Sequence, residues 1–227
     1  TAARLMQAGL CDAAAVGGVD SLCLTTLYGF SALQLLSADP CRPCDEDRDG
    51  LSLGEAAGYA LLEFGERVGG RGTVALLGYG ESTDGYHMSH PHPEGAGAVR
   101  AIRDSLARAS LRAEDIEYIN LHGTATRAND SVEDKAVYSI FGARPACSST
   151  KGWTGHTLGA AGITEAVISA LCLAQGLMPG TLNCQRVDSS LKSRILRENQ
   201  TGSISFAVSN IFGFGGNNCS LVLGKLP

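Results

Sequence analysis

Basic runs are absent from this 227-residue chain, whose formal net charge is −5. Nucleic acid binding relies on clustered Lys and Arg, so the sequence argues against a nucleic acid partner. The net charge does not exclude an anionic protein partner, because an acidic chain can still carry a local basic patch. No stretch reaches the roughly 18 uncharged apolar residues that a membrane span needs. The opening Thr-Ala-Ala-Arg resembles neither a signal peptide nor a natural N-terminus, and we expect a chain entered partway through a helix.

Paired cysteine ligands are lacking as well. The eight cysteines are scattered, and most lie in apolar surroundings, as Cys172 and Cys219 do. This pattern predicts free, buried thiols in a reducing cytosol. Cys41 and Cys44 have the spacing of a zinc ligand pair, but no second pair completes a site. We therefore interpret residues 40–50 as a polar, turn-rich loop.

Glycine beside polar side chains is plentiful, in three segments. His122 lies in NLHGTAT at 120–126, His156 lies in KGWTGHTLGAAG at 151–162, and the third segment is SNIFGFGGN at 209–217. Glycine lets a ligand approach the backbone closely, and imidazole donates or accepts a hydrogen bond at pH 7. One histidine alone would usually be a core residue bonded to a backbone carbonyl. Two of them in such segments indicate a reaction centre.

Predicted strands and helices alternate along the chain. The predicted strands are residues 12–19, 55–64, 73–80, 116–121, 203–208 and 219–223. The predicted helices are 25–37, a helix opened by Pro93, 130–141 and 158–175. This order predicts an α/β layered fold with the active loops at strand ends, and a buried first strand. The last helix is apolar nearly all round, so we expect it between two sheets.

Three carboxylates accompany the histidine segments. Glu165 is the only charge in the predicted helix 158–175, and Lys151 precedes the histidine of the second segment. A buried carboxylate must meet a cation, a metal ion or strong donors, in a structural ion pair or a catalytic role. Asp130 and Glu133 have the spacing of a capping box, which is compatible with a second role in holding Lys151.

Other residues have both a structural and a functional interpretation. Thr124 and Thr126 either bond their own backbone or offer hydroxyls to a ligand. The run HMSHPH at 87–92 is stiffened by proline and lacks a carboxylate to complete a metal site, which favours a substrate-entrance loop. The glycines at 212–216 fit a tight hairpin, or a turn whose backbone N–H serves an oxyanion hole.

Together these segments resemble the C-terminal portion of a chain-elongating β-ketoacyl-acyl-carrier-protein synthase, of the thiolase-like superfamily. The motifs HGTAT, KxxxGHxLGAAG and NxFGFGGxN occur in this order, and the loop at 40–55 matches too. The similarity covers essentially the whole chain. It implies a thiolase-like layered α-β-α-β-α fold, with 1–64 as the end of the N-terminal half and 65–227 as the C-terminal half.

The resemblance implies a decarboxylative Claisen condensation of malonyl-carrier protein with an enzyme-bound acyl thioester, in fatty acid or polyketide/polyene biosynthesis. His122 and His156 would stabilise the enolate oxygen. Lys151, paired with Asp130 and Glu133, would support the charge distribution around the two histidines and the enolate.

Further roles follow from the same motifs. Thr124 and Thr126 would bind the pantetheine arm. Phe214, flanked by Gly213 and Gly215, would supply an oxyanion-hole N–H and gate the acyl pocket. In some relatives four positions surround a monovalent cation, and here they are matched by Asn120, Glu165, Ser209 and Asn210. Glu165 would also support the catalytic residues.

No cofactor is implied, because the substrates ride on the phosphopantetheine of an acyl carrier protein, the expected partner. The implied enzyme is cytoplasmic and homodimeric when intact. The family's nucleophilic cysteine would precede Thr1 in a missing N-terminal segment, and Cys11 lies at the wrong end of its helix to replace it. The alternatives are a non-catalytic subunit that shapes a chain-length pocket and an inactive assembly module. The second histidine motif disfavours a thiolase.

Overall fold

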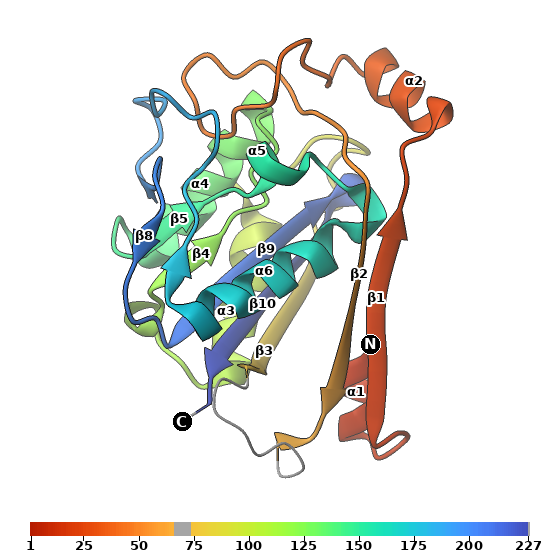
Figure 1. Ribbon diagram of the computed structural model, residues 1–227, viewed down its shortest axis with the longest axis vertical. Coiled ribbons are helices and arrows are strands. Elements are labelled where there is room, and N and C mark those ends of the chain that lie inside the picture. The colour runs from red at the N-terminus through yellow and green to blue at the C-terminus, as the bar shows by residue number, and fades with distance from the viewer. Residues whose placement is uncertain (66–73, 227) are drawn as a thin grey trace.

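A six-stranded sheet is the centre of the computed structural model, which describes residues 1–65 and 74–226 (Figure 1). The strand order is β3-β10-β9-β4-β5-β7. β10 runs antiparallel to both neighbours, whereas β9, β4, β5 and β7 run parallel to one another. The strands are β3 Val74–Thr83, β4 Tyr118–Asn120, β5 Ala146–Ser148, β7 Arg194–Ile195, β9 Phe206–Gly213 and β10 Asn217–Lys225.

Helices cover both faces of this sheet. α3 (Ala96–Ala109) packs on β3 and β10, and α4 (Arg127–Phe141) packs against α3. On the opposite face α6 (Ala161–Gln175) crosses β9 and β10 (Figure 1). Beyond α6 lies a second sheet, in which β1 (Ala13–Asp20) pairs antiparallel with β2 (Ala56–Glu63). The described residues thus form four successive layers, which confirms the predicted α/β layered architecture.

The smaller elements connect these layers. β6 pairs antiparallel with β8 in a third, short sheet. α5 and η3 lie between β5 and α6 and carry the second histidine segment. The bounds are α1 Ala2–Gln7, α2 Leu24–Ala32, α5 Lys151–Thr154, β6 Leu177–Met178, β8 Gln200–Thr201, and the 3₁₀ turns η2 Ala113–Asp115, η3 Leu158–Ala160 and η4 Phe214–Gly216.

α6 lies between the two sheets, as predicted. Its buried positions include Ala161, Glu165 and Ser169, spaced by four residues along one face, and Ile163 lies against Gly58 of β2. The stretch 158–175 is long and apolar enough to cross a membrane by length and composition alone. Here it contacts strands of both sheets and carries a buried carboxylate. It is therefore a core helix of this fold.

The strands divide the core into two clusters, because successive side chains of a strand point to opposite faces. Val208 and Val222 pack with Ile102 of α3 in one cluster. Ala207 and Leu223, their neighbours in sequence, belong to a second cluster that includes Leu173 of α6 and Tyr118 of β4. The alternation fixes which side chains of β9 can face each helix layer.

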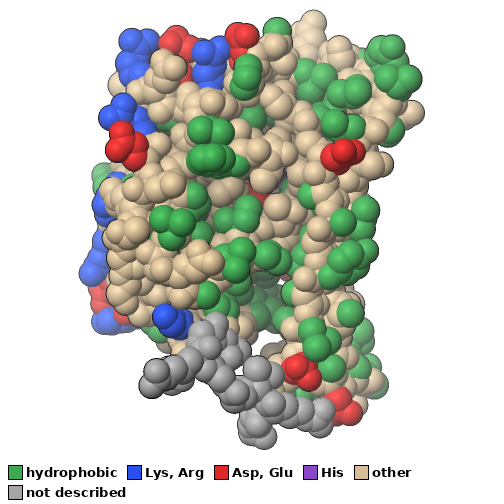
Figure 2. All heavy atoms as spheres, in the orientation of Figure 1, with side chains coloured by type: hydrophobic (Ala, Val, Ile, Leu, Met, Phe, Trp, Pro, Cys, Tyr) green, Lys and Arg blue, Asp and Glu red, His purple; other side chains and the backbone are tan. Residues whose placement is uncertain are grey.

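The expectation of a buried strand at 12–19 is wrong. β1 exposes every second residue, and on the same face Tyr59 and Leu61 of β2 are largely exposed. Figure 2 shows hydrophobic side chains gathered along the part of the surface formed by β1 and β2. Small and apolar residues occupy both faces of this sheet, so the sequence resembles that of a doubly covered strand. Among the described residues, however, only the face toward α6 is covered. Thr73, predicted to begin the next strand, lies outside the described residues.

Several further boundaries differ from the prediction by a few residues, and two of these differences are the largest. The helix expected at 25–37 ends at Ala32, where the chain turns through Gln34 in a left-handed conformation (φ 56°). The strand expected to stop at Val208 continues to Gly213 and pairs with β10. Most of the third glycine-rich segment is therefore strand, and its turn is confined to η4. The register of β9 against β10 overrides the local preference of glycine for turns.

Candidate active site

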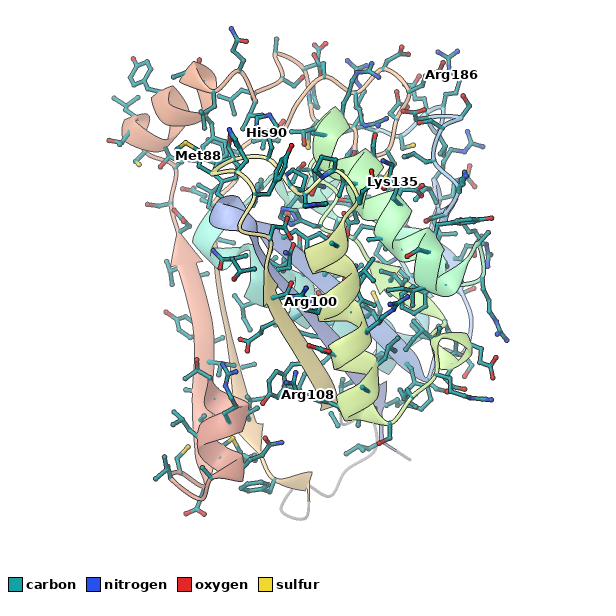
Figure 3. All side chains as sticks on the ribbon, turned by 180° about the vertical axis from the view of Figure 1, so that it is seen from behind. Met88, His90, Arg100, Arg108, Lys135 and Arg186 are labelled. Atoms are coloured by element: carbon teal, nitrogen blue, oxygen red, sulfur yellow. The ribbon has the colours of Figure 1, made fainter. Side chains whose placement is uncertain are left out.

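All three glycine-rich segments meet at one cavity of about 280 Å³. Its wall includes His122, His156 and Phe214. The cavity also borders α2 and the loop after β3, where Figure 3 shows His90 and Met88. The two histidine rings lie 5.3 Å apart between centroids, with an angle of 84° between their planes. The sequence expectation that both imidazoles converge on one pocket is confirmed.

Backbone hydrogen bonds position His122 at the end of β4. Its amide N–H and that of Gly123 donate to the two carboxylate oxygens of Glu133, each at 2.8 Å. Its ring is 6.1 Å from that of Phe212, between centroids. The residue is only 4% exposed. Glu133 therefore fixes the turn that directs His122 into the cavity.

A separate set of contacts positions His156. Its amide N–H donates to the carbonyl of Ser52 at 2.7 Å, and its carbonyl accepts from Gly54 N–H at 3.0 Å. These bonds tie the second histidine segment to the loop before β2. Gly54 has no room for a side chain, because a Cβ there would lie 2.0 Å from the carbonyl oxygen of Thr154. The close approach explains one glycine of the loop at 40–55.

The hydrogen bonds also identify which ring nitrogen of each histidine carries the proton. His122 Nδ1 lies 3.3 Å from Lys151 Nζ, an ammonium that can only donate. His156 Nδ1 accepts from the Leu158 amide N–H at 3.3 Å. Both Nδ1 atoms are therefore acceptors, which leaves the proton of each neutral ring on Nε2. Two N–H donors are then available at one site.

Both imidazoles are neutral at pH 7. Burial, followed by the charge of Lys151, lowers the pKa of His156 to about 3. Burial and then Lys151 also lower the pKa of His122 well below its ordinary value. A cationic ring is disfavoured in both positions because it would lose hydration beside a fixed ammonium.

Lys151 is 1% exposed and forms an ion pair with Glu165 Oε1, which is 2% exposed. Its ammonium also donates to the backbone carbonyl of His122. The expectation that Glu165 meets a cation is confirmed. Among the described residues the ion-pair partner of Lys151 is Glu165, whereas Glu133 accepts two backbone amides and Asp130 pairs with Arg48. Burial raises the pKa of Glu133, and the charge of Lys151 still opposes that rise. Burial raises the pKa of Glu165 to about 7 against the opposing effect of Lys151.

Asp130 belongs to a separate buried network. It accepts a hydrogen bond from the amide N–H of Cys44 at 2.9 Å and lies 3.4 Å from Arg48 Nε. Arg48, itself 1% exposed, also pairs with Asp188 at 2.7 Å. The capping-box interpretation is wrong as well, since Thr126 is the N-cap of α4. The network fastens the loop at 40–50, predicted as a polar loop, to α4 and the segment after α6.

Two threonines and a phenylalanine complete the cavity wall. The hydroxyls of Thr124 and Thr126 lie 2.8 Å apart and bond to one another. Phe214 is 46% exposed at the cavity mouth. Gly215 follows it with φ 76°, and Gly213 also lines the cavity. These five residues are placed together, as the sequence predicts.

Four buried oxygen atoms of the residues predicted to surround a monovalent cation have no hydrogen-bond partner among the described residues. Asn120 and Ser209 are paired across β4 and β9, and Glu165 projects from α6. Asn210 points to the opposite face of β9, where its amide lies 3.5 Å from Glu133. The four atoms are Asn120 Oδ1, Glu165 Oε2, Ser209 Oγ and Asn210 Oδ1. Such unpaired oxygens are the donor type that a hard cation prefers.

Other candidate sites do not assemble. His87 and His90 lie with their Nδ1 atoms 3.2 Å apart on an exposed loop. No group of three or more metal-ligating side chains occurs in residues 1–65 and 74–226. The eight cysteines are free, and five of them are buried, as the scattered pattern predicts. None of the eight lines the cavity.

Two functional residues were not identified from the sequence. Phe30 lines the cavity, although the sequence indicates only an apolar position of the predicted helix 25–37. Its helical spacing with Leu27 and Leu33 is the same whether the side chain packs in the core or lines the cavity, so the pattern does not distinguish the two. Arg48 stands among four acidic residues in a run that resembles a solvated loop. Its burial depends on Asp130 and Asp188, which are distant in sequence.

Comparisons with known proteins agree with this arrangement. Residues 1–67 match the family model of the β-ketoacyl synthase N-terminal domain, and residues 74–185 match that of the C-terminal domain. A 3-oxoacyl-[acyl-carrier-protein] synthase 2 from Rhizobium meliloti is 40% identical over 239 residues, 99% of this chain and 56% of that protein. The chain belongs to the β-ketoacyl synthase family.

Solved structures place the fold in the same class. A chain of the complex between the ketosynthase ApeO and its chain length factor ApeC from Xenorhabdus doucetiae superposes with a TM-score of 0.93 at 44% identity over 99% of this chain and 56% of that chain. A β-ketoacyl synthase from Burkholderia phymatum gives 0.94 at 32% identity over 100% of this chain and 58% of that chain. The fold is thiolase-like. The chain spans about half the length of these relatives.

Proposed function

We propose that this chain carries the decarboxylation site of a β-ketoacyl-acyl-carrier-protein synthase, an acyltransferase. The observation that carries the proposal is the pair of neutral imidazoles, 5.3 Å apart in one cavity, each with its Nε2–H free to donate. Two neutral donors suit an oxygen that becomes negative during the reaction and is uncharged before it.

The proposed step begins with a malonyl thioester on a carrier protein. The bond between its carboxylate carbon and its α-carbon breaks, CO₂ leaves, and the electron pair forms an enolate on the thioester. His122 and His156 donate to the enolate oxygen, and Lys151 holds the Nδ1 atom of His122. The α-carbon then attacks the carbonyl of an acyl chain bound as a cysteine thioester, and the thiolate leaves.

Substrate positioning falls to the rest of the cavity. Thr124 and Thr126 would hydrogen-bond the pantetheine arm that carries the malonyl group. Phe214, with its flanking Gly213 and Gly215, would donate a backbone N–H to the acyl carbonyl and gate the acyl pocket with its ring. We propose an acyl carrier protein as the partner, a homodimeric assembly and a cytoplasmic location, with residues 1–64 and 65–227 as parts of the two thiolase-like halves.

A monovalent cation fits three of the unpaired oxygens. Asn120 and Ser209 would supply neutral oxygens and Glu165 a carboxylate oxygen, whereas Asn210, on the opposite face of β9, would lie outside this set. The bound charge would hold Glu165 and, through it, Lys151. We expect K⁺ or Na⁺ to raise the unfolding temperature relative to equal ionic strength of a large organic cation. An equal unfolding temperature in all three salts would remove the cation from the account.

A chain-length-shaping partner subunit is the second candidate. It is favoured by the similarity of this chain to a chain in the complex of a ketosynthase with its chain length factor. Such a subunit would change product length without releasing CO₂ from malonyl-carrier protein. An inactive assembly module would do neither.

The experiment that separates these candidates measures CO₂ release from malonyl-carrier protein by the purified chain. His156→Ala should lower the rate by about 10²-fold, the usual loss when one oxyanion donor is removed. Glu114→Ala, at an exposed residue of η2 that does not line the cavity, is the control and should retain the rate. Unchanged CO₂ release by a folded His156→Ala variant would end the assignment. No release by the unmodified chain would leave the chain-length-shaping subunit and the inactive module, which differ in whether adding the chain changes product length.

A further inference from the structure

Phe30 and Phe214 form a stacked pair at the mouth of the cavity. Their ring centroids lie 5.5 Å apart and their planes are 18° from parallel. Both rings line the cavity that contains the two histidines. Phe30 comes from α2 and Phe214 from η4, which are 184 positions apart in the chain (214 minus 30). The contact therefore joins two elements that the sequence does not link.

Hydrogen bonds hold the backbone around Phe214, but they do not involve its ring. Gly215 N–H donates to the carbonyl of Met88 at 2.8 Å, and the Asn217 amide donates to the carbonyl of Phe214 at 3.1 Å. Glycines on both sides of Phe214 place no side chain against the ring. Phe214 is 46% exposed, so part of the residue is open to solvent. Stacking on Phe30 is the aromatic contact that keeps the ring across the cavity mouth.

α2 is suited to follow a movement of this pair. None of its nine residues is buried. Its helix ends at Ala32, ahead of the left-handed turn at Gln34. An element with few buried contacts shifts at low free-energy cost.

We propose that Phe30 is the positioning residue of the gate: it holds the Phe214 ring in the closed position, and separation of the two rings admits the acyl chain. This rests on the proposed function of the cavity as an acyl pocket. An acyl chain that enters must break the stack, so loss of the Phe30 ring should tighten acyl binding. The expected change is about two- to tenfold, the usual range for one aromatic pair.

The first test follows the Phe214 ring directly, by ¹⁹F NMR of protein labelled with 4-fluorophenylalanine. The Phe214 signal is assigned by its loss in Phe214→Leu. Phe30→Leu should move this signal, because the ring current of the stacked partner is removed. Tyr28→Leu is the matched control, an aromatic residue of the same helix that is 70% exposed, and should leave the signal in place. Phe30→Tyr should retain it too.

The second test measures binding of octanoyl-pantetheine in a double-mutant cycle. If Phe30 acts through Phe214, the double Leu variant should bind like Phe214→Leu alone, whereas independent pocket residues would give additive effects. Additive effects, or a Phe214 signal that Phe30→Leu does not move, would overturn the inference. A signal that moves while no variant binds octanoyl-pantetheine supports the ring pairing and counts against the proposed acyl pocket instead.

Discussion

At the scale of single residues, the charge of Lys151 acts on both imidazoles. It lies 3.3 Å from Nδ1 of His122, which directs the proton of that ring to Nε2. The same charge lowers the pKa of His156. A lysine beside two histidines therefore favours neutral donors over cations. This is the state that a developing oxyanion needs, because the donors keep their protons throughout the step.

The first residue-scale prediction concerns Glu165. Replacement by Gln leaves the buried ammonium of Lys151 without a carboxylate, so Glu165→Gln should lower the free energy of unfolding by about 3–5 kcal/mol. Urea denaturation measures the change. Glu114→Gln, which breaks an exposed ion pair with Arg112, is the control and should cost less than about 1 kcal/mol. Equal costs for the two variants would contradict a buried pair.

Residue types were more predictable than their partners. The histidine segments identify His122 and His156 because both imidazole and glycine are needed at the site. Asp130 and Glu133, expected to pair with Lys151, form their hydrogen bonds and ion pair with other groups. No sequence pattern indicates that Glu133 accepts hydrogen bonds from two backbone N–H groups, or that Arg48 forms an ion pair with Asp130. Such partnerships depend on the distances between elements that fold together.

At the scale of elements, close contact between α3 and β3 depends on glycine. A Cβ on Gly80 would lie 1.8 Å from the carbonyl oxygen of Ala101, and one on Gly78 would lie 2.2 Å from that of Ser105. Both obstacles are backbone atoms, which cannot rotate away. The helix therefore sits on the strand at a distance that only glycine permits.

The corresponding prediction is that Gly80→Ala destabilises the chain. The helix must shift away from the strand, so the expected loss is about 1–3 kcal/mol in the free energy of unfolding, the usual cost of overpacking. Chemical denaturation provides the measurement. Gly29→Ala is a suitable control, since a Cβ there meets nothing within 4 Å on α2. Unaltered stability of Gly80→Ala would mean that α3 and β3 are not so tightly packed.

Element types followed from hydrophobic periodicity, whereas exposure did not. The helix at 158–175 was expected between two sheets because it is apolar on nearly every side, and α6 lies there. The same reasoning failed for β1, whose small apolar residues fit a covered strand but are alternately exposed. Periodicity reports what a face can bury. It does not report which element covers that face.

At the scale of the whole molecule, stability should depend on the histidine pair. Burial lowers the pKa of His156 to about 3 in the folded chain, below its ordinary value of 6.5. Between these values the unfolded chain binds a proton that the folded chain does not. Stability is therefore lost as the pH falls through this window, by about 1.4 kcal/mol per pH unit. Glu133 and Glu165, with pKa values raised to about 7, act in the opposite direction between pH 7 and 4.5.

A variant isolates the histidine contribution from that of the carboxylates. His156→Asn removes the titrating ring and leaves Glu133 and Glu165 in place. Between pH 6.5 and 5.5 the wild-type chain should lose about 1 kcal/mol of stability relative to His156→Asn. Urea denaturation at several pH values gives the comparison, and His87→Asn serves as the control on the exposed loop. Parallel pH profiles for the wild type and His156→Asn would show that the folded ring takes up protons normally.

¹⁵N NMR of the histidine side chains at pH 7 reports the protonation state and the tautomer of both rings. We expect His122 and His156 to be neutral and to carry the proton on Nε2, with assignments from His122→Asn and His156→Asn. A cationic ring, or a proton on Nδ1 of either residue, would contradict this expectation.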